Sequence, residues 1–386
     1  MEKLKNSIKY NFLNYTLIVE LVIIFLLFQL LTDGLFMTTR NLSNLMLQGV
    51  TCSLIAITMM LVIVTCNADL SAGAAIGFIG TFAATIQVAS WNTGMTFVMV
   101  IAVSLAIGVW HGFWIAYKEL PAFIVTLATQ LVLRGLNLLV GGGVSIGPVS
   151  TEFSHLGRSY LPGIFGGESF NGLSLVLTIV GIVIFLAISI SQENKKIKLG
   201  LVESNWKKKG PMIVLYAAIA LAVASIFIFY LGFPFAIIIL VVLVVIFEFV
   251  VKSTVFGRHV FAVGGNSEAA RLSGVNIERT VMAVYILHSL VVGLAAVVFL
   301  GRIGQASPTA GTAFEFTAIT GCVVGGTSIM GGRGTVIGAV IGTMLMASLD
   351  NGMSLLNLGQ SGQFIIKGLV LMLAIALDVI SRNKTG

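Results

Sequence analysis

Side chains that could carry chemistry are few in this sequence of 386 residues, and their spacing predicts no catalytic centre. The four histidines, His111, His155, His259 and His288, lack the spacing of metal ligands, and no serine lies in a Gly-x-Ser-x-Gly turn that would expose a nucleophile. The three cysteines form no Cys-x-x-Cys pair, which argues against a zinc site or a disulfide framework. The sequence contains no Gly-x-x-x-x-Gly-Lys-Ser/Thr loop, so we expect the chain to hydrolyse no nucleotide. We therefore expect no catalytic residue, no metal ion and no cofactor.

Asp69 is the ionisable residue that most needs an explanation, because it interrupts two apolar runs that are each long enough to cross a membrane. A charge at that depth costs several kcal/mol unless it finds a partner or a polar cavity. In one interpretation, Asp69 lies in a simple turn and caps the next helix, helped by Ser71. In the other, a broken helix dips into the membrane, and its free backbone groups and Asp69 line a water-filled route. The sequence leaves both interpretations open.

A second, glycine-rich interruption lies at 324–334. A similar small-residue apolar segment follows each interruption, at 75–81 and at 339–343, which indicates an internal repeat. In transporters, paired interruptions often mark the substrate path, although close helix packing also explains glycine-rich apolar sequence. The candidates for lining such a path are Asn67, Asp69, Ser71, Thr327, Ser328 and Asn351.

A polar stretch over 257–279 lies between two further apolar runs. The glycine pair Gly264 and Gly265 is expected to break the chain there. Gly274, which adopts a left-handed conformation at no steric cost, is expected to end a helix of about two turns that lies between these glycines.

Asn266 or Ser267 is expected to cap the start of this short helix, with an acidic residue in its first turn and a basic one in its last. A helix so short is marginal alone and would gain order by docking into a groove of a partner protein. Ala269, Ala270 and Leu272 would fill that groove. An ordinary loop with a helical turn is the alternative. The residues expected to carry the contact are Gly264, Gly265, Asn266, Glu268, Ala269, Ala270, Arg271 and Gly274.

The composition places these residues in a membrane protein, since 57% of the residues are hydrophobic and only 10% are charged. Runs of about 20 apolar residues, enough to cross the hydrocarbon core as helices, recur along the chain. We expect an all-α polytopic membrane protein, a single domain over 1–386 with about 10–12 transmembrane helices. The candidate spans are 14–32, 43–65, 70–89, 95–117, 122–141, 172–191, 211–231, 234–251, 280–301, 313–330, 334–349 and 362–380.

The distribution of lysine and arginine predicts the orientation. If the N-terminus is cytoplasmic, most of the 22 basic residues fall in cytoplasmic segments, and both termini are then cytoplasmic. This makes 192–210 a cytoplasmic linker, 252–279 a cytoplasmic loop and 142–171 an extracytoplasmic loop. The net charge of +7 is thus a topology signal, and no nucleic acid is expected as a partner. Acidic residues near the span ends are expected to extend to water: Glu20, Glu248, Glu315 and Asp378.

Several of these motifs together, in order and over nearly the full chain, make the sequence resemble the permease subunit of bacterial ABC sugar importers of the ribose, xylose and galactose type. It is most similar to the xylose or multiple-sugar permeases. At one place it departs from the family's usual pattern, because Cys66, Asn67 and Ala68 replace two glycines and an aliphatic residue. The motifs are Gly257–Arg279, Asp69-Leu70-Ser71, Pro121–Leu127, Arg134-Gly135, Gly325–Ser328 and Asn351-Gly352.

The resemblance implies a protein of the bacterial cytoplasmic membrane, surrounded by lipid. Two permease chains, expected to be identical, would form the pore. A cytoplasmic ABC ATPase subunit would grip the short helix around 266–274, and an extracytoplasmic sugar-binding protein would deliver the sugar. The ATP cycle would drive alternating access. A sugar is uncharged, so it suits a path with few ionisable groups.

Two other functions are alternatives to a subunit of an ABC importer. An ion-coupled secondary carrier working alone generally needs a buried carboxylate or a histidine relay, for which Asp69 is the fair candidate. A membrane scaffold or an exporter component would show no sugar-dependent ATP hydrolysis in the assembled complex.

Overall fold

The computed structural model describes residue 17 and residues 19–164, 170–199 and 206–383. These residues form two compact units, which are considered separately below. The larger unit comprises the described parts of 1–37, 45–158 and 236–386, and the smaller comprises 38–44 and the described parts of 159–235. The single domain over 1–386 stays a prediction.

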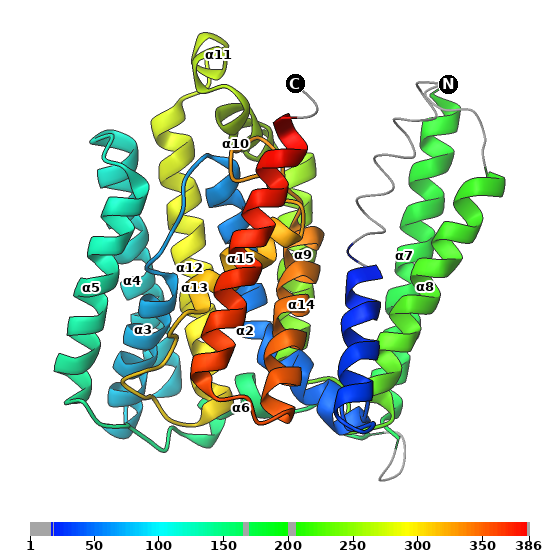
Figure 1. Ribbon diagram of the computed structural model, residues 1–386, viewed down its shortest axis with the longest axis horizontal. Coiled ribbons are helices and arrows are strands. Elements are labelled where there is room, and N and C mark those ends of the chain that lie inside the picture. The colour runs from blue at the N-terminus through cyan, green and yellow to red at the C-terminus, as the bar shows by residue number, and fades with distance from the viewer. Residues whose placement is uncertain (1–16, 18, 165–169, 200–205, 384–386) are drawn as a thin grey trace. The chain divides into compact units, whose positions relative to one another are not determined.

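The larger unit is built from helices, as expected where apolar runs must satisfy their backbone hydrogen bonds internally. It contains the helix Val19–Leu31 and the labelled helices of Figure 1 other than α7 and α8. α2 begins at Thr39, just inside the smaller unit. The labelled helices are α2 (Thr39–Val64), α3 (Ala72–Val88), α4 (Thr93–Gly112) with a π-helical extension over Phe113–Tyr117, α5 (Ala122–Gly141), α6 (Thr151–Arg158), α9 (Phe235–Ser253), α10 (Val255–Gly265), α11 (Ser267–Leu272), α12 (Ile277–Ile303), α13 (Phe314–Val324), α14 (Val336–Leu355) and α15 (Gln360–Asn383).

The smaller unit is a pair of packed helices, α7 (Gly172–Lys198) and α8 (Trp206–Ile228). Asn171 caps α7 by accepting a hydrogen bond from the Ser174 amide at 2.9 Å. The predicted linker 192–210 is largely helical where the structure describes it, because α7 continues to Lys198, ends in a turn at Leu199, and α8 already begins at Trp206. Residues 200–205 of that segment lie outside the described residues.

The predicted all-α polytopic architecture is confirmed. Within the described ranges, 9 helices are long and apolar enough to cross a membrane, and three shorter apolar helices, Val19–Leu31, Ala72–Val88 and Phe314–Val324, match the other predicted spans. The predicted span 313–330 is too long, because its helix ends at Val324. Gly326, at φ +90°, then turns the chain with a backbone that side-chain-bearing residues rarely adopt.

Helices α2 and α12 form the centre of the larger unit, and small residues let α12 approach α4 closely. A methyl group on Gly108 would lie 2.8 Å from Ile286 Cα and 3.0 Å from Tyr285 O, both backbone atoms of α12. Farther along the pair, a methyl group on Gly293 would overlap Ser104 Oγ. Close backbone approach replaces large side chains here, as in other membrane helix pairs.

Two helices of the larger unit, α3 and α13, begin inside the bundle rather than at its ends (Figure 1). The connection into α3 contacts His288, near the midpoint of the 27-residue helix α12. The first turns of α3 and α13 touch, because a methyl group on Gly73 would overlap Glu315 Oε2 in the first turn of α13 and the Gly311 carbonyl oxygen just before it. Both are therefore half-helices that start at mid-depth.

We predict that Gly108→Ala destabilises the protein by about 1–3 kcal/mol, because its methyl group meets backbone that cannot rotate away. Thermal melting of the detergent-purified chain measures the effect. Gly135→Ala is the matched control, since nothing lies within 4 Å of the methyl group it would add. Equal melting temperatures for the two variants would contradict the packing described for α4 and α12.

Candidate functional site

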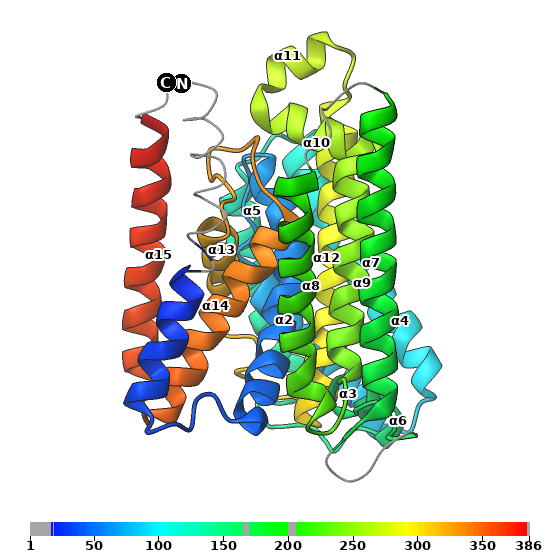
Figure 2. The ribbon, with the colours of Figure 1, turned by 90° about the vertical axis from the view of Figure 1, so that its right-hand side faces the viewer.

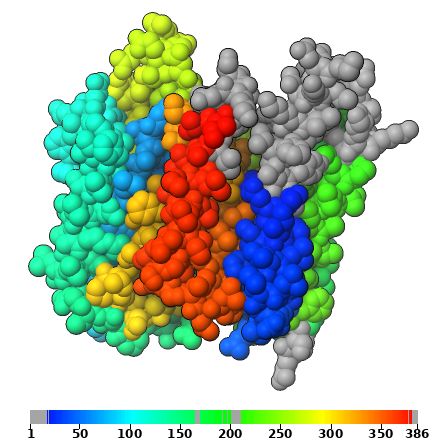
Figure 3. Space-filling model, in the orientation of Figure 1, coloured from blue at the N-terminus to red at the C-terminus, as the bar shows by residue number. Residues whose placement is uncertain are grey.

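Helix α11 projects from one end of the larger unit (Figures 2 and 3). The Asn266 side chain caps it by accepting a hydrogen bond from the Ala269 amide at 2.9 Å, and Gly274 ends it at φ +84°. The predicted start and stop are thus confirmed. Arg271 Nη2 forms an ion pair with Glu278 Oε1 at 3.2 Å, which ties α11 to the first turn of α12.

The exposed face of α11 differs in part from the prediction. Glu268 and Ala269 are exposed as expected, and Leu272 is 85% exposed. Ala270 is buried against its own chain and is 5% exposed, so it cannot fill a partner's groove in this conformation. Within the α11 face, Leu272 is the large apolar side chain open to a partner.

The expectation that Gly264 and Gly265 break the chain is wrong, because they are the last two residues of α10. The break falls at Asn266, whose backbone is extended. Gly264 is instead a packing residue: a methyl group there would overlap the carbonyl oxygen of Val64 at the end of α2. A methyl group added to Gly265 would have no other atom within 4 Å among the described residues.

Three chain segments meet at the base of α11, namely Val64–Cys66, Gly264–Gly265 and Met330–Gly332, and we call this contact the glycine junction. The Gly332 amide donates to Val64 O at 3.0 Å. Cys66 Sγ donates to Gly264 O at 3.5 Å and to Met330 O at 3.3 Å. The junction therefore joins α10 and α11 to the connection that enters α3 and to the connection between α13 and α14.

Left-handed backbone makes the glycine junction compact. Gly331 and Gly332 have φ values of +80° and +72°, at which glycine carries no steric penalty. Cys66 has φ +60° and pays about 1–2 kcal/mol for the same conformation. Asn67, a predicted path residue, lies beside the junction and donates from Nδ2 to Thr65 O at 3.0 Å.

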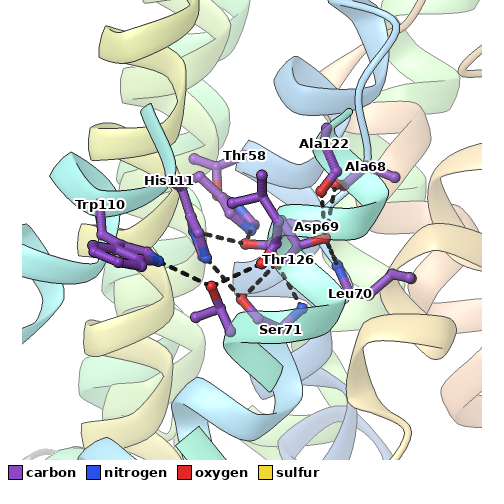
Figure 4. Close-up of polar contacts among 12 residues, drawn as sticks. Thr58, Ala68, Asp69, Leu70, Ser71, Trp110, His111, Ala122 and Thr126 are labelled. Atoms are coloured by element: carbon purple, nitrogen blue, oxygen red, sulfur yellow. Dashed lines mark hydrogen bonds and ion pairs between the residues drawn. The ribbon is translucent and has the colours of Figure 1, made fainter. Parts of the chain in front are cut away.

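Asp69 lies inside the bundle at 2% exposure, held by Ser71 and by histidines from α4 and α12 (Figure 4). Its Oδ1 accepts from the Ser71 amide at 2.6 Å and from Ser71 Oγ at 2.7 Å. Its Oδ2 lies 3.3 Å from His288 Nε2 and 3.8 Å from His111 Nδ1. Thr58 Oγ1 lies 2.9 Å from His288 Nδ1 and completes the cluster. The interruption is therefore an embedded break, and Asp69 is enclosed by partners in this conformation.

Helix α5 supplies the side chains that hold the irregular backbone. Thr126, Gln130, Arg134 and Asn137 recur at helical spacing along one face, and we call them the α5 polar stripe. Irregular backbone at membrane depth is tolerated only where such groups satisfy it. The hydrogen bonds are Leu70 N to Thr126 Oγ1 at 3.2 Å, Gln130 Nε2 to Glu315 Oε1 at 3.2 Å, Arg134 Nη1 to Ala310 O at 2.7 Å and Asn137 Nδ2 to Pro308 O at 3.0 Å.

Glu315 does not extend to water as expected, because it is 1% exposed. It lies in the first turn of α13, where the helix dipole favours a carboxylate. Asp378 also has a specific contact, since its Oδ2 accepts from Ser328 Oγ at 3.2 Å and from the Ile329 amide at 3.3 Å. Glu248 pairs with Lys252 one turn along α9.

The predicted path residues do not form one site. Asp69 and Ser71 lie together in the interior, whereas Thr327 and Ser328 are buried in the turn between α13 and α14. Asn351 is 5% exposed and lies near the C-terminal end of α14. The polar stripe and Glu315 were missed, although the recurrence of polar residues every three or four positions in an apolar run was a visible signal.

The interruption at 324–334 is not the interior counterpart of 65–71, because it packs in the glycine junction at the end of the bundle. The interior counterpart is 304–313, between α12 and α13. Gly304 and Gly311 have positive φ there, and Pro308 lies between them. A long helix, a polar break and a half-helix thus occur twice, as α2–α3 and as α12–α13, running from opposite ends of the bundle (Figure 1).

Comparison with known proteins gives a consistent result over almost the whole chain. The family described as "Branched-chain amino acid transport system / permease component" matches residues 41–375. The chain is 36% identical to the xylose transport system permease protein XylH of Escherichia coli (strain K12) over 372 residues, 96% of this chain and 93% of the relative.

Two further relatives support this match. The XylH protein of Haemophilus influenzae is 36% identical over 386 residues, which cover both chains completely. The ribose import permease protein RbsC of Escherichia coli (strain K12) is 30% identical over 343 residues, 89% of this chain and 87% of the relative. No solved structure matches the chain.

We predict that Gly264→Ala opens the glycine junction and speeds the reaction of Cys66 with a polar maleimide severalfold, because the added methyl group pushes the Val64 carbonyl away. Labelling followed by mass spectrometry measures the rate. Gly265→Ala should react as wild type. Cys52 and Cys322 are buried and serve as internal references. A Gly264→Ala variant that reacts no faster than Gly265→Ala would argue against the junction.

We also predict that Asp69→Ala lowers the stability by about 3–5 kcal/mol, because it leaves two buried histidines and Ser71 without their common partner. Asp69→Asn should cost less, since its side-chain oxygen can still accept from the Ser71 amide. Denaturation of the purified variants in detergent gives both values. A loss below about 1 kcal/mol for Asp69→Ala, the size of an exposed pair, would contradict the buried cluster.

Proposed function

This chain belongs to the family described as "Branched-chain amino acid transport system / permease component", and we propose that it is the membrane-spanning subunit of an ATP-binding-cassette importer for a monosaccharide, xylose or a related sugar. It is a multi-pass protein of the bacterial cytoplasmic membrane. The sugar assignment is supported by the relatives, which are named as xylose and ribose permeases.

The observation that carries the proposal is the combination of α11 with the glycine junction. α11 has both ends capped and presents Leu272, which is 85% exposed, between charged residues. Leu272 would insert into a groove of a separate cytoplasmic ATPase, while Glu268 and Arg271 contact the rim. Hydrolysis would occur on that partner, and this chain would be non-catalytic.

Alternating access would follow from movement of α11. Movement of α11 would shift α10 and, through Gly264, would shift Val64 and Gly332. Val64 precedes the connection into α3, and Gly332 lies in the connection that follows α13. Closure of the ATPase on nucleotide would shift these segments together, and hydrolysis would return them. Packed interfaces of this kind switch between discrete arrangements instead of deforming continuously.

Two further partners complete the proposal. An extracytoplasmic sugar-binding protein would dock at the end of the larger unit opposite α11, where α6 lies (Figure 1). A second copy of the chain would form the other half of the pore. Lipid would cover the remaining apolar faces, such as the exposed side of α5 with Leu131 and Leu139.

Co-purification with candidate ATPase and binding proteins, followed by reconstitution, tests the function. We expect sugar to stimulate ATP hydrolysis in the complex and to cross the vesicle membrane only when all components are present. Transport by this chain alone on an ion gradient would instead identify an ion-coupled carrier. Assembly without any sugar-dependent hydrolysis would identify a scaffold or an exporter component.

We predict that Leu272→Asp weakens association with the ATPase by about tenfold or more, since burying an unpaired carboxylate in an apolar groove costs more than 1.4 kcal/mol. Affinity of the detergent-purified components reports the change. Glu278→Gln is the control, because it removes only a surface ion pair worth at most about 1 kcal/mol. Unchanged affinity in Leu272→Asp would show that α11 is not the contact.

A further inference from the structure

The start of α3 meets the start of α13 and the chain just before it at a close contact. A methyl group on Gly73 would overlap both the Gly311 carbonyl oxygen and Glu315 Oε2, and a methyl group on Gly311 would overlap the Gly73 carbonyl oxygen. We call these three residues the half-helix contact. Because the backbones of Gly73 and Gly311 touch and the side chain in this contact is the polar one of Glu315, a small separation of α3 from α13 would open a polar passage at mid-depth.

Glu315 brings unused hydrogen-bonding capacity to the half-helix contact. Its Oε1 accepts from Gln130 Nε2, whereas its Oε2 is buried and has no hydrogen-bond partner among the described residues. Asn137 Oδ1, on the α5 polar stripe, is likewise buried without a partner there. An unsatisfied buried acceptor costs about 1–3 kcal/mol, so both atoms would gain from a ligand that donates hydrogen bonds.

Donors stand beside these acceptors. Gln130 and Arg134 are only partly buried, and a guanidinium has five N–H groups, of which Arg134 uses one to donate a hydrogen bond to Ala310 O. A carboxylate, amides and a guanidinium together match the hydroxyl groups of a neutral polyol, which both donate and accept. Because Glu315 and Arg134 carry opposite charges, an ion of either sign would be attracted by one of them and repelled by the other, which favours a neutral ligand.

We propose that the half-helix contact is the closed constriction of the translocation path, and that Glu315 accepts hydrogen bonds from the hydroxyl groups of a neutral sugar that passes along the α5 polar stripe when α3 and α13 separate. The inference rests on the proposed function, sugar import, and assigns the path to residues on α3, α5 and α13.

Transport by Glu315→Gln in the reconstituted complex tests the role of the carboxylate. Loss of a charge-assisted hydrogen bond worth about 1.5–3 kcal/mol should slow sugar transport about tenfold or more. Glu248→Gln, which removes only the ion pair with Lys252 one turn along α9, should transport as wild type. A wild-type complex that transports beside an equally active Glu315→Gln variant overturns this inference alone. A wild-type complex that moves no sugar overturns the proposed function.

A wedge at the contact tests the constriction without any partner protein. Gly73→Ala should hold the half-helices apart, so liposomes that contain this chain alone should leak xylose severalfold faster than wild type. Gly80→Ala, in the same helix with nothing within 4 Å of its added methyl group, should not leak. An unchanged leak in Gly73→Ala overturns the constriction.

A comparison of a neutral and a charged solute distinguishes leakage along a path lined by Glu315 from nonspecific leakage through a damaged protein. Glu315 repels an anion and Arg134 attracts it, so neutralising Glu315 should raise the leakage of the anion xylonate relative to xylose: the double variant Gly73→Ala with Glu315→Gln should show a higher xylonate-to-xylose ratio than Gly73→Ala. An unchanged ratio indicates a nonspecific defect and overturns the role of Glu315.

Discussion

The structure depends on one close backbone approach, in which Gly264 lies against the Val64 carbonyl while the Gly332 amide donates to the same oxygen. Any side chain at position 264 would separate these segments. The contact is small, but it joins the projecting helix α11 to both connections that lead into the bundle. In the proposed function, a force on α11 would reach the interior through these backbone contacts, as a subunit driven from outside would require.

The interior holds two broken helices at mid-depth, and the proposed path would require these helices to part. The α5 polar stripe and the cluster of Asp69 with His111 and His288 satisfy the irregular backbone and the buried charge. Polar contacts of this kind are specific in direction but short in range. They fix one arrangement firmly and can be exchanged for another, which suits a path that is closed in one state and open in the next.

The fold was largely predictable, because each apolar run long enough to cross a membrane must become a helix. The caps of α11 at Asn266 and Gly274 were also predictable, since capping depends on local residue types. Gly264 was misjudged because close packing and chain breaking use the same residue, and only tertiary contacts distinguish them. Glu315 was misjudged for a related reason: its distance along the chain from a span end did not reveal that α13 begins inside the bundle.

Hydrogen–deuterium exchange in the complex of this chain with its proposed ATPase, with and without a non-hydrolysable nucleotide, tests the coupling through the glycine junction most directly. We expect exchange in peptides over 64–72 and 325–335 to change together with exchange over 264–274, because the glycine junction would move as one body. A change confined to 266–274, with both other segments unaffected, would contradict this coupling.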